Sequence, residues 1–353
     1  MRAWSYHNPV AIHFGVGSLE CLPDVVGDRR AVVVTFPEAQ ACGLAGRVKR
    51  LLGDRCLDLI DRTPPNPDVE NLEALYDEFW DRHAGCEVIV AVGGGSVLDT
   101  AKVLATAALA PSFDALLAGL AGASPYRPSR FKPLLAVPTT AGTGSEVTRW
   151  ATVWDRAAGR KHSLDIAQTW PEAAIVDPLL ALTLPPAPTV AAGLDALSHA
   201  LEALWNVHAN PVSDAHAIGA AREVMTVLPR VVAQPEDVSL RSRLALAALC
   251  AGLAFSNTRT ALAHSMSYEL TLRHGLAHGI ACSFTLPLVL RLAIGVEEER
   301  DEALRRVFGG SLFDAPDTLE RFLNRLGVGT NFADHGIAES EAARIIAAAA
   351  DGV

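Results

Sequence analysis

The sequence predicts an α/β half built on a parallel sheet, followed by an all-helical half. Short β-branched runs alternate with helical segments between residues 31 and 176, which is the pattern of a parallel sheet with helices on both faces. A proline cluster, Pro185-Pro186-Ala187-Pro188, ends this pattern. Beyond it, Ala and Leu recur at helical spacing and β-branched runs become scarce. We therefore expect two domains, residues 1–180 and 181–353, that meet near residues 178–188.

The elements of the α/β half follow from short apolar runs, which are typical of strands covered on both faces. Such strands are predicted at Ala31–Val34, Val88–Val92, Leu134–Val137 and Ala173–Val176. Amphipathic segments between them predict helices at Leu44–Leu52 and Val69–His83. The segment Glu146–Val153 precedes a polar turn at Asp155–Gly159, so a hairpin is expected there.

Composition narrows the class of protein. The chain of 353 residues is 50% hydrophobic and 20% charged, with a formal net charge of -10, as expected for a soluble globular protein with a large core. The negative charge is spread along the chain, which argues against nucleic acid or an anionic membrane as the main partner. An anionic ligand would therefore have to meet local positive charge.

The cysteines and the absence of long apolar stretches suggest a compartment. The six cysteines, at positions 21, 42, 56, 86, 250 and 282, form no Cys-x-x-Cys pair. The opening residues lack the apolar core of a signal peptide, and no uninterrupted apolar stretch reaches the roughly 18 to 20 residues that span a bilayer. We expect reduced thiols and a cytoplasmic protein without a membrane span.

One stretch places a carboxylate and an imidazole on the same helix face. Asp195 and His199 stand four residues apart in a helical sequence, so their side chains are stacked. His264 and His278 lie further on, each in an Ala- and Leu-rich helical context. Three imidazoles and one carboxylate could converge on a divalent metal ion.

Spacing alone does not select the ligands. A single histidine in a helix is more often a hydrogen-bonded core or surface residue than a ligand. His274 also stands four residues from His278, although Gly275 between them makes a continuous helix less secure.

Two glycine-rich loops follow predicted strands. Residues 93–96, Gly-Gly-Gly-Ser, turn directly into a helix, so backbone N–H groups there could surround a phosphate. A tight strand-to-helix turn explains the same glycines, and the Gly-x-Gly-x-x-Gly fingerprint is absent. The second loop, residues 138–146, is rich in Thr, Ser and Gly. Open α/β sheets bind ligands beyond the carboxyl ends of their strands. Each loop therefore strengthens the interpretation of the other as part of a ligand-binding site.

These motifs occur together in a characteristic order. They are Gly93–Ser96 with Asp99 and Lys102, Pro138–Glu146, Asp177–Pro178, Gly193–His199, His264 and His278–Gly279. In this order, from about residue 8 to about residue 330, the chain resembles the iron-containing (group III) alcohol dehydrogenases. The resemblance implies a Rossmann-like dinucleotide-binding domain and an all-helical metal-binding domain, an architecture shared with dehydroquinate synthase.

The resemblance also implies the site residues. A divalent metal, Fe²⁺ or Zn²⁺, would be held by Asp195, His199, His264 and His278, and would act as a Lewis acid on the substrate oxygen. The cofactor, NAD or NADP, would lie along residues drawn from both loops and the hairpin: Gly93, Gly94, Gly95, Ser96, Asp99, Thr139, Thr140, Thr143, Ser145 and Lys161.

Two departures from the family pattern bear on cofactor choice and proton transfer. Many NAD-preferring relatives carry an aspartate after the first strand, whereas residues 34–37 here read Val-Thr-Phe-Pro, so we expect NADP to be tolerated. Relatives often carry a second histidine where this chain has Tyr268. A phenol with a pKa of about 10 is a poor base at neutral pH. His274 is therefore the expected proton relay, with Tyr268 as the other catalytic candidate.

A third departure bears on the substrate. Relatives commonly have a small residue such as glycine at the position of Arg259, five residues before His264. Its guanidinium, together with Asn257, could bind an anionic substrate, although a solvated or ion-paired arginine is an equal alternative. Residues 4–9, 263–268 and 281–287 resemble the branch associated with phosphonate metabolism, whose enzymes reduce phosphonoacetaldehyde to 2-hydroxyethylphosphonate.

The expected function is therefore metal-dependent, NAD(P)H-linked reduction of a short anionic aldehyde by a cytoplasmic enzyme, with a homodimer as the expected assembly. A general short-chain alcohol dehydrogenase without anion preference is the alternative. A sugar-phosphate cyclase of the dehydroquinate synthase type would need more basic residues around the site. A non-catalytic protein that binds a metal and a nucleotide would need a blocked cleft.

Overall fold

The computed structural model describes residues 3–123 and 126–351, which form two compact units. The α/β unit comprises Pro9–Thr140 and Ser145–Ala181. The helical unit comprises Met1–Asn8, Ala141–Gly144 and Leu182–Val353. Two short segments remote in sequence, at the N-terminus and in the second glycine-rich loop, thus belong to the helical unit by their contacts.

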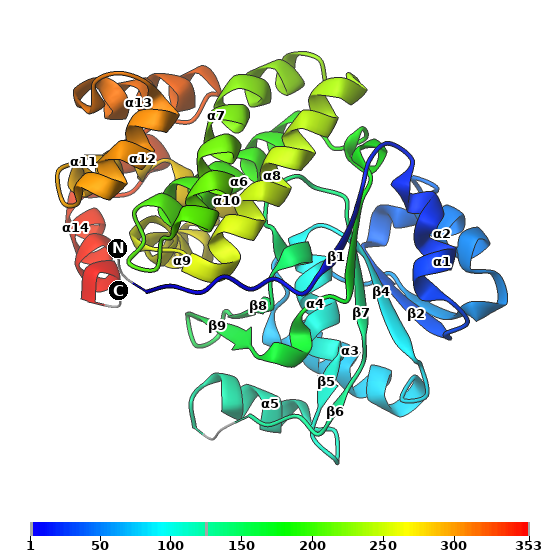
Figure 1. The fold of residues 1–353 in the computed structure, drawn as a ribbon. Helices are drawn as coiled ribbons and strands as arrows, with labels where there is room; N and C mark the ends of the chain where they lie inside the picture. The colour runs from blue at the N-terminus through cyan, green and yellow to red at the C-terminus, as the bar shows by residue number, and fades with distance from the viewer. Residues whose placement is uncertain (1–2, 124–125, 352–353) are drawn as a thin grey trace. The chain divides into compact units, whose positions relative to one another are not determined.

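A six-stranded parallel sheet forms the centre of the α/β unit, in the order β1-β10-β7-β4-β2-β3 (Figure 1). Its strands are β1 (Ala11–Phe14), β2 (Ala31–Thr35), β3 (Cys56–Ile60), β4 (Val88–Gly93), β7 (Leu134–Pro138) and β10 (Ala173–Val176). In the middle of the sheet, Ala91 of β4 pairs with Val34 of β2 and Ala136 of β7. The carboxyl ends of β4 and β7, which carry the two glycine-rich loops, are therefore adjacent.

Helices cover both faces of this sheet. They are α1 (Leu22–Val26), α2 (Leu44–Leu52), α3 (Val69–Arg82), α4 (Gly95–Leu104) and α5 (Phe113–Leu120). Val33 of β2 packs in the cluster with α1 and α2, whereas its neighbours Val32 and Val34 pack in the cluster with α3, α4 and α5. Successive side chains of a strand point to opposite faces, so each central strand contributes to two apolar layers.

The central strands match the predictions to within a residue, whereas the two edge strands are missed. Strands β2, β4, β7 and β10 are buried throughout, which is why they read as continuous apolar runs. Strands β1 and β3 lie at the edges; β1 is mostly exposed and β3 is mostly half-buried. A half-exposed strand of four or five residues carries no apolar run for the sequence to reveal.

The predicted hairpin is present, with a later start than expected. Strands β8 (Trp150–Asp155) and β9 (Arg160–Asp165) pair in antiparallel fashion around the predicted turn. Residues Ser145–Val147 form a short 3-10 helix instead of extending the strand. A second antiparallel pair joins β5 (Thr106–Ala107) to β6 (Arg130–Phe131).

Within the described residues, the chain beyond the proline cluster is helical, as predicted. Its helices are α6 (Pro186–Leu204), α7 (Pro211–Ala233), α8 (Val238–Thr258), α9 (Leu262–His274), α10 (His278–Ser283), α11 (Leu286–Ala293), α12 (Glu298–Phe308), α13 (Ala315–Arg325) and α14 (Glu339–Asp351). Pro186 is the first residue of α6, a position where proline needs no N–H donor. Helices α6, α7, α8 and α10 pack together (Figure 1).

Helix α8 is long and apolar enough, by length and composition, to cross a membrane. The sequence predicts no such segment because Arg241 and Arg243 interrupt its apolar run. The helix is mostly buried against α6 and α7, and a core helix passes the same test. Burial of the Arg241 guanidinium is accommodated by hydrogen bonds to Thr189 Oγ1 and to two backbone carbonyls.

Close packing of α10 on α6 gives a first prediction. A Cβ on Gly279 would lie 1.9 Å from the carbonyl oxygen of Ala191, so Gly279→Ala forces the two helices apart. We expect it to lower the stability of the protein by about 3 kcal/mol, the upper end for overpacking, as measured by thermal unfolding.

Gly219 supplies the matched control, because it lies in α7 and a Cβ there meets nothing within 4 Å. Gly219→Ala should stabilise the protein by about 0.5–1 kcal/mol through its higher helix propensity. Equal melting temperatures for the Gly279→Ala variant and the unmodified protein would contradict the close approach.

Candidate active site

Helix α6 carries three ionisable side chains on one buried face. Asp195, His199 and Glu202 follow one another at spacings of four and three residues, so they line the same side of the helix. Their exposed fractions are 3%, 5% and 0%. Charged groups are rarely buried to this extent without partners, so this face of α6 marks a site.

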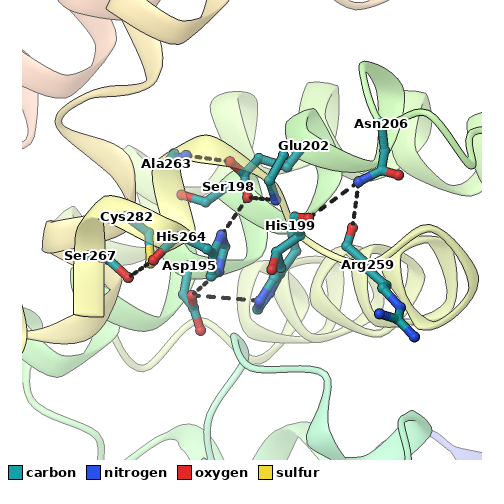
Figure 2. Close-up of polar contacts among 12 residues, drawn as sticks. Asp195, Ser198, His199, Glu202, Asn206, Arg259, Ala263, His264, Ser267 and Cys282 are labelled. Carbon is teal, nitrogen blue, oxygen red and sulfur yellow. Dashed lines mark hydrogen bonds and ion pairs between the residues drawn. The ribbon is translucent and has the colours of Figure 1, made fainter. Parts of the chain in front are cut away.

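Three imidazoles converge on one oxygen of Asp195. The Nε2 atoms of His264, His199 and His278 lie 3.6, 3.8 and 3.9 Å from Asp195 Oδ1. His264 comes from α9 and His278 is the first residue of α10. Figure 2 shows the Asp195 carboxylate between His199 and His264. The four residues predicted as metal ligands are thus brought together from three helices.

These separations suit a shared divalent ion. Ligand atoms bonded to one ion in a tetrahedron, at about 2.0–2.2 Å, lie about 3.3–3.6 Å apart, slightly closer than the distances observed. Among the described residues, Asp195 Oδ1, His264 Nε2 and His199 Nδ1 are buried without a hydrogen-bond partner. Buried polar atoms without partners are costly, and coordination of a metal would satisfy Oδ1 of Asp195 and Nε2 of His264. The residues present therefore fit the group.

Electrostatics within the cluster favour the ligand forms of two residues. Burial lowers the pKa of His199 to about 3, so its imidazole is neutral and has a lone pair for a metal. Burial acts to raise the pKa of Asp195, but the three imidazoles outweigh it and hold that pKa below the ordinary value. The His199 ring is further fixed by stacking on Phe255 and His264, with ring centroids 3.9 and 4.6 Å apart.

Glu202 orients His264 from behind. Its carboxylate lies 2.7 Å from His264 Nδ1 and accepts hydrogen bonds from the backbone N–H groups of Ala261 and Ala263 at 2.7 and 2.6 Å. A carboxylate on the far nitrogen of a ligand histidine sets its tautomer and leaves Nε2 for the metal. Glu202 is not among the residues predicted from the sequence, although its position seven residues after Asp195 on one helix face is a usable signal.

Cys282 is a second residue that sequence reasoning misses. It lies four residues after His278 on α10 and is fully buried. Its Sγ is 3.6 Å from His278 Nε2. Donor atoms of Asp195, His264, His278 and Cys282 all lie within 4.8 Å of one another.

In the α/β unit, the two glycine-rich loops lie against each other. Thr139 N donates to the carbonyl of Gly93 at 3.0 Å, and a Cβ on Gly94 would come within 3.3 Å of Thr140 Cγ2. Helix α4 begins at Gly95 with Gly94 as its N-cap, so its first amides have no partner within the helix. The hydroxyl of Ser96 accepts a hydrogen bond from Asn66 N, which ties the segment around Asn66 to the first loop.

A buried charge network lies beneath these loops. Lys102 Nζ donates to the carbonyl and hydroxyl oxygens of Ser145, and the Ser145 hydroxyl donates to Asp99 at 2.7 Å. Burial lowers the pKa of Lys102 to about 8, and it raises the pKa of Asp99 and also that of Glu146, the latter to about 7. The network fixes Ser145 and both oxygens of Asp99, the second of which accepts from a backbone N–H of β8. Lys161 of β9 is near enough to lower the pKa of Asp99.

The rest of the second loop packs in the helical unit. A Cβ on Gly142 would meet the carbonyl oxygen of Ala192 at 2.7 Å, and one on Gly144 would meet the Cα of Gly252 at 2.6 Å. Gly144 also has a φ of 61°. These glycines allow residues 141–144, including Thr143, to lie against α6 and α8, so that this candidate cofactor residue belongs to the unit that carries the metal ligands.

Comparison with known proteins decides the family. The family described as iron-containing alcohol dehydrogenase matches residues 9–178, and its C-terminal domain matches residues 189–352. The chain belongs to the iron-containing alcohol dehydrogenase family. It is 31% identical to the NAD-dependent methanol dehydrogenase of Bacillus methanolicus, over 90% of this chain and 84% of that protein. It is also 31% identical to the 1,3-propanediol dehydrogenase of Citrobacter freundii, over 96% and 90% of the two chains.

Solved structures agree with this membership. The sulfoacetaldehyde reductase of Bifidobacterium kashiwanohense, solved in complex with NAD+, superposes with a TM-score of 0.91 at 31% identity, covering 99% of this chain and 93% of that one. The protein is thus an iron-type alcohol dehydrogenase or aldehyde reductase with the family's parallel-sheet and helical domains. Members use NAD(H) and Fe²⁺ or another divalent metal, which the cluster on α6, α9 and α10 is suited to hold.

The two predicted proton-transfer residues lie in different surroundings. Tyr268 follows His264 by one helical turn, and its ring is parallel to that of His278 with centroids 6.4 Å apart. His274 ends α9, with Nε2 3.3 Å from the carboxylate of Glu341 in α14. Gly275 stops the helix in the left-handed conformation, so His274 and His278 do not share a helix face. The relay role of His274 stays a prediction.

The two predicted substrate residues also differ. Asn257 accepts a hydrogen bond from His7 N at 2.8 Å and donates to His7 O at 3.1 Å, so its amide holds the N-terminal segment. Arg259 is exposed and caps the end of α8. Figure 2 shows its guanidinium extending away from Asp195 on the His199 side of the cluster.

Glu202 is expected to control metal affinity through His264. Glu202→Gln preserves the shape of the side chain but removes the charge that three N–H donors face. We expect affinity for Zn(II) or Fe(II) to fall about 10- to 100-fold, as is typical for such orienting residues. Competition with a chromophoric chelator measures this change.

Glu223→Gln is the matched control, since Glu223 makes only a half-exposed ion pair with Arg243 and such pairs contribute about 0–1 kcal/mol. Its metal affinity should equal that of the unmodified protein. Equal affinities for both variants would show that Glu202 has no part in holding His264 for the metal.

Proposed function

We propose that this iron-containing alcohol dehydrogenase reduces a short aldehyde that carries an anionic group, with phosphonoacetaldehyde, reduced to 2-hydroxyethylphosphonate, as the favoured substrate. The observation that carries the proposal is Arg259, a cation held in a conformation reserved for glycine. Its φ and ψ are 72° and 179°. Residues other than glycine occupy that region at a cost of about 1–3 kcal/mol, and they do so mainly at functional sites.

Several contacts enforce this conformation. Arg259 N donates to Phe255 O at 2.8 Å, closing the last turn of α8. Asn206 Nδ2 donates to Thr260 O at 3.3 Å, and Glu202 holds the next amide, that of Ala261. The backbone that carries Arg259 is thus tied to α6, the helix that carries Asp195 and His199.

The same contacts connect the backbone of Arg259 to residues that pack on the metal cluster. Phe255, whose carbonyl accepts from Arg259, stacks its ring on His199. The loop from residue 259 leads after five residues to His264. A guanidinium suits bidentate, charge-assisted binding of a phosphonate or sulfonate. In this proposal, the Arg259 side chain turns from the direction seen in Figure 2 toward a two-carbon substrate whose aldehyde end would lie at the metal.

The structural relative named as a sulfoacetaldehyde reductase supports an anionic aldehyde. Sulfoacetaldehyde and phosphonoacetaldehyde share a two-carbon aldehyde and a tetrahedral anionic group, so a site for one suits the other in shape. Sulfoacetaldehyde is therefore the second candidate substrate. The net charge of -10 repels both anions in general, so local positive charge decides their binding.

In the proposed reaction, Asp195, His199, His264 and His278 hold the divalent metal, and Glu202 fixes His264. When bound, the metal polarises the aldehyde oxygen as a Lewis acid. The cofactor supplies the hydride. Arg259 binds the anionic group of the substrate, and so orients the carbonyl for attack.

The α/β unit supplies the cofactor site in this proposal. The amides of Gly94, Gly95 and Ser96 at the start of α4 would hold the pyrophosphate of the cofactor. The buried hydrogen bonds that join Asp99 and Lys102 to Ser145 hold the second loop in place. The remaining predicted contacts with the dinucleotide are by Gly93, Thr139, Thr140 and Lys161 of this unit, and by Thr143 of the helical unit.

Replacing Arg259 tests the substrate class. Arg259→Ala should raise KM for phosphonoacetaldehyde about 10- to 100-fold, the loss of a charge-assisted contact worth about 1.5–3 kcal/mol. KM for propanal, which carries no charge, should not change. Initial rates of NADH or NADPH consumption with both aldehydes, and with sulfoacetaldehyde, give the comparison.

Two further variants separate charge from strain. Arg259→Gly loses the same charge but relieves the backbone, so it should be about 1 kcal/mol more stable than Arg259→Ala with an equally high KM for the anion. Arg243→Ala, on the same helix α8, should leave both KM values unchanged. Equal effects of Arg259→Ala on charged and neutral aldehydes would leave a general alcohol dehydrogenase as the function.

Cofactor choice is a separate part of the proposal. Strand β2 ends at Thr35, whose hydroxyl donates a hydrogen bond to Val92 O at 2.7 Å. Phe36 follows, at the end of the strand where many NAD-preferring relatives have an aspartate. The first carboxylate beyond the strand is that of Glu38, which is exposed. Without an acidic group at the strand end, a 2′-phosphate is not strongly repelled.

We therefore expect kcat/KM for NADPH to lie within about 100-fold of that for NADH, a difference below about 2.7 kcal/mol. Glu38→Gln should raise the ratio of kcat/KM for NADPH to that for NADH, because it removes the carboxylate nearest in sequence that could repel the 2′-phosphate. A larger preference for NADH in the unmodified protein would overturn the expectation.

The remaining parts of the proposal are cellular and quaternary. Family membership favours a dehydrogenase over a sugar-phosphate cyclase, and net oxidation of NAD(P)H by an aldehyde distinguishes the two. A cytoplasmic location and a homodimer remain part of the proposal. Sedimentation of the purified protein tests the second.

A further inference from the structure

The geometry points to Cys282 as a metal ligand, an additional soft donor beside Asp195, His264 and His278. This inference rests on the metal site of the proposed function and changes its chemistry. The Sγ atom lies 3.6 Å from His278 Nε2, and it is part of the group of four donor atoms within 4.8 Å of one another. With His199 as a further nitrogen donor, the centre has one oxygen, three nitrogens and one sulfur.

The placement of Cys282 follows from α10. This short helix begins at His278, so residue 282 returns to the same face one turn later. Gly279 lets that face approach α6 closely, because even a methyl group at this position would meet the Ala191 carbonyl. This close packing brings the imidazole of His278 and the thiol of Cys282 near the carboxylate of Asp195.

The surroundings of Cys282 are unlike those of an ordinary buried cysteine. A free cysteine in a core behaves as a small apolar residue, whereas Cys282 lies against the imidazoles of His264 and His278. An independent observation also indicates a ligand. Asp195 Oδ1 and His264 Nε2 are about 97% buried in residue terms and have no hydrogen-bond partner among the described residues. Donor atoms of both residues lie within 4.8 Å of the thiol sulfur.

A thiolate ligand has consequences for the metal. Its proton is released when the metal binds. The predicted set of one carboxylate and three neutral imidazoles leaves a net charge of about +1 on a divalent ion, and a thiolate reduces it to about zero. Soft sulfur also favours zinc over iron. We therefore expect this chain to take Zn(II) in preference to Fe(II) when both are offered.

Cobalt substitution tests the ligand directly. The metal-stripped protein, reloaded with one equivalent of Co(II), should show the near-ultraviolet charge-transfer band of a thiolate bound to cobalt. Cys282→Ser and Cys282→Ala should lose this band while still binding one cobalt ion. Cys250→Ser is the matched control, since Cys250 is another free thiol of the helical unit, on α8, and it should keep the band.

X-ray absorption of the zinc form provides a second readout. One sulfur at about 2.3 Å is expected in the unmodified protein and in Cys250→Ser, and only nitrogen and oxygen at about 2.0–2.2 Å in Cys282→Ser. Near-ultraviolet circular dichroism of each variant confirms that it is folded.

Three outcomes overturn the inference. Stoichiometric cobalt without the band in the unmodified protein, or a band that persists in Cys282→Ser, removes Cys282 from the ligand set but leaves the proposed aldehyde reduction intact. Failure of the unmodified protein to bind any divalent metal removes this inference and the proposed metal site together.

Discussion

The helical unit depends on the buried carboxylate of Glu202. It accepts hydrogen bonds from Ala261 N and Ala263 N and holds His264 Nδ1, so one charge on α6 fixes both the start of α9 and the orientation of its histidine. A fully buried carboxylate is costly unless every lone pair finds a donor. That requirement ties the loop from α8 to α9, which follows Arg259, to helix α6.

The second constraint on the structure is close approach between backbone segments, which glycine allows at three positions. Gly279 lets α10 lie on α6, while Gly142 and Gly144 let the second loop lie on α6 and α8. Each contact brings a functional group to the same helix: His278 and Cys282 in the first case, Thr143 in the others. These three glycines are therefore needed for the close packing of α10 and of the second loop on the neighbouring helices.

Arg259 combines a charged side chain with a backbone conformation that suits glycine. Its dihedral angles lie in a region that glycine enters without strain. Strain of this kind in other residues occurs mainly at functional sites. The cation at this position is the main distinction proposed between this chain and a dehydrogenase of neutral alcohols, whereas Cys282 is the main distinction proposed at the metal.

The sequence by itself determined the central strands and the helical half, because doubly buried strands and helix faces repeat with short, local periods. Spacing placed only Asp195 and His199 on one helix face, and the full set with His264 and His278 came from the order of motifs shared with the family. The sequence did not reveal the edge strands β1 and β3, whose half-exposed residues lack a continuous apolar run. Glu202 and Cys282 became part of the site only in the tertiary structure, as did the role of Asn257 in holding His7. Which polar atoms meet across helices α6, α9 and α10 depends on crossing geometry, and local spacing carries no information about that geometry.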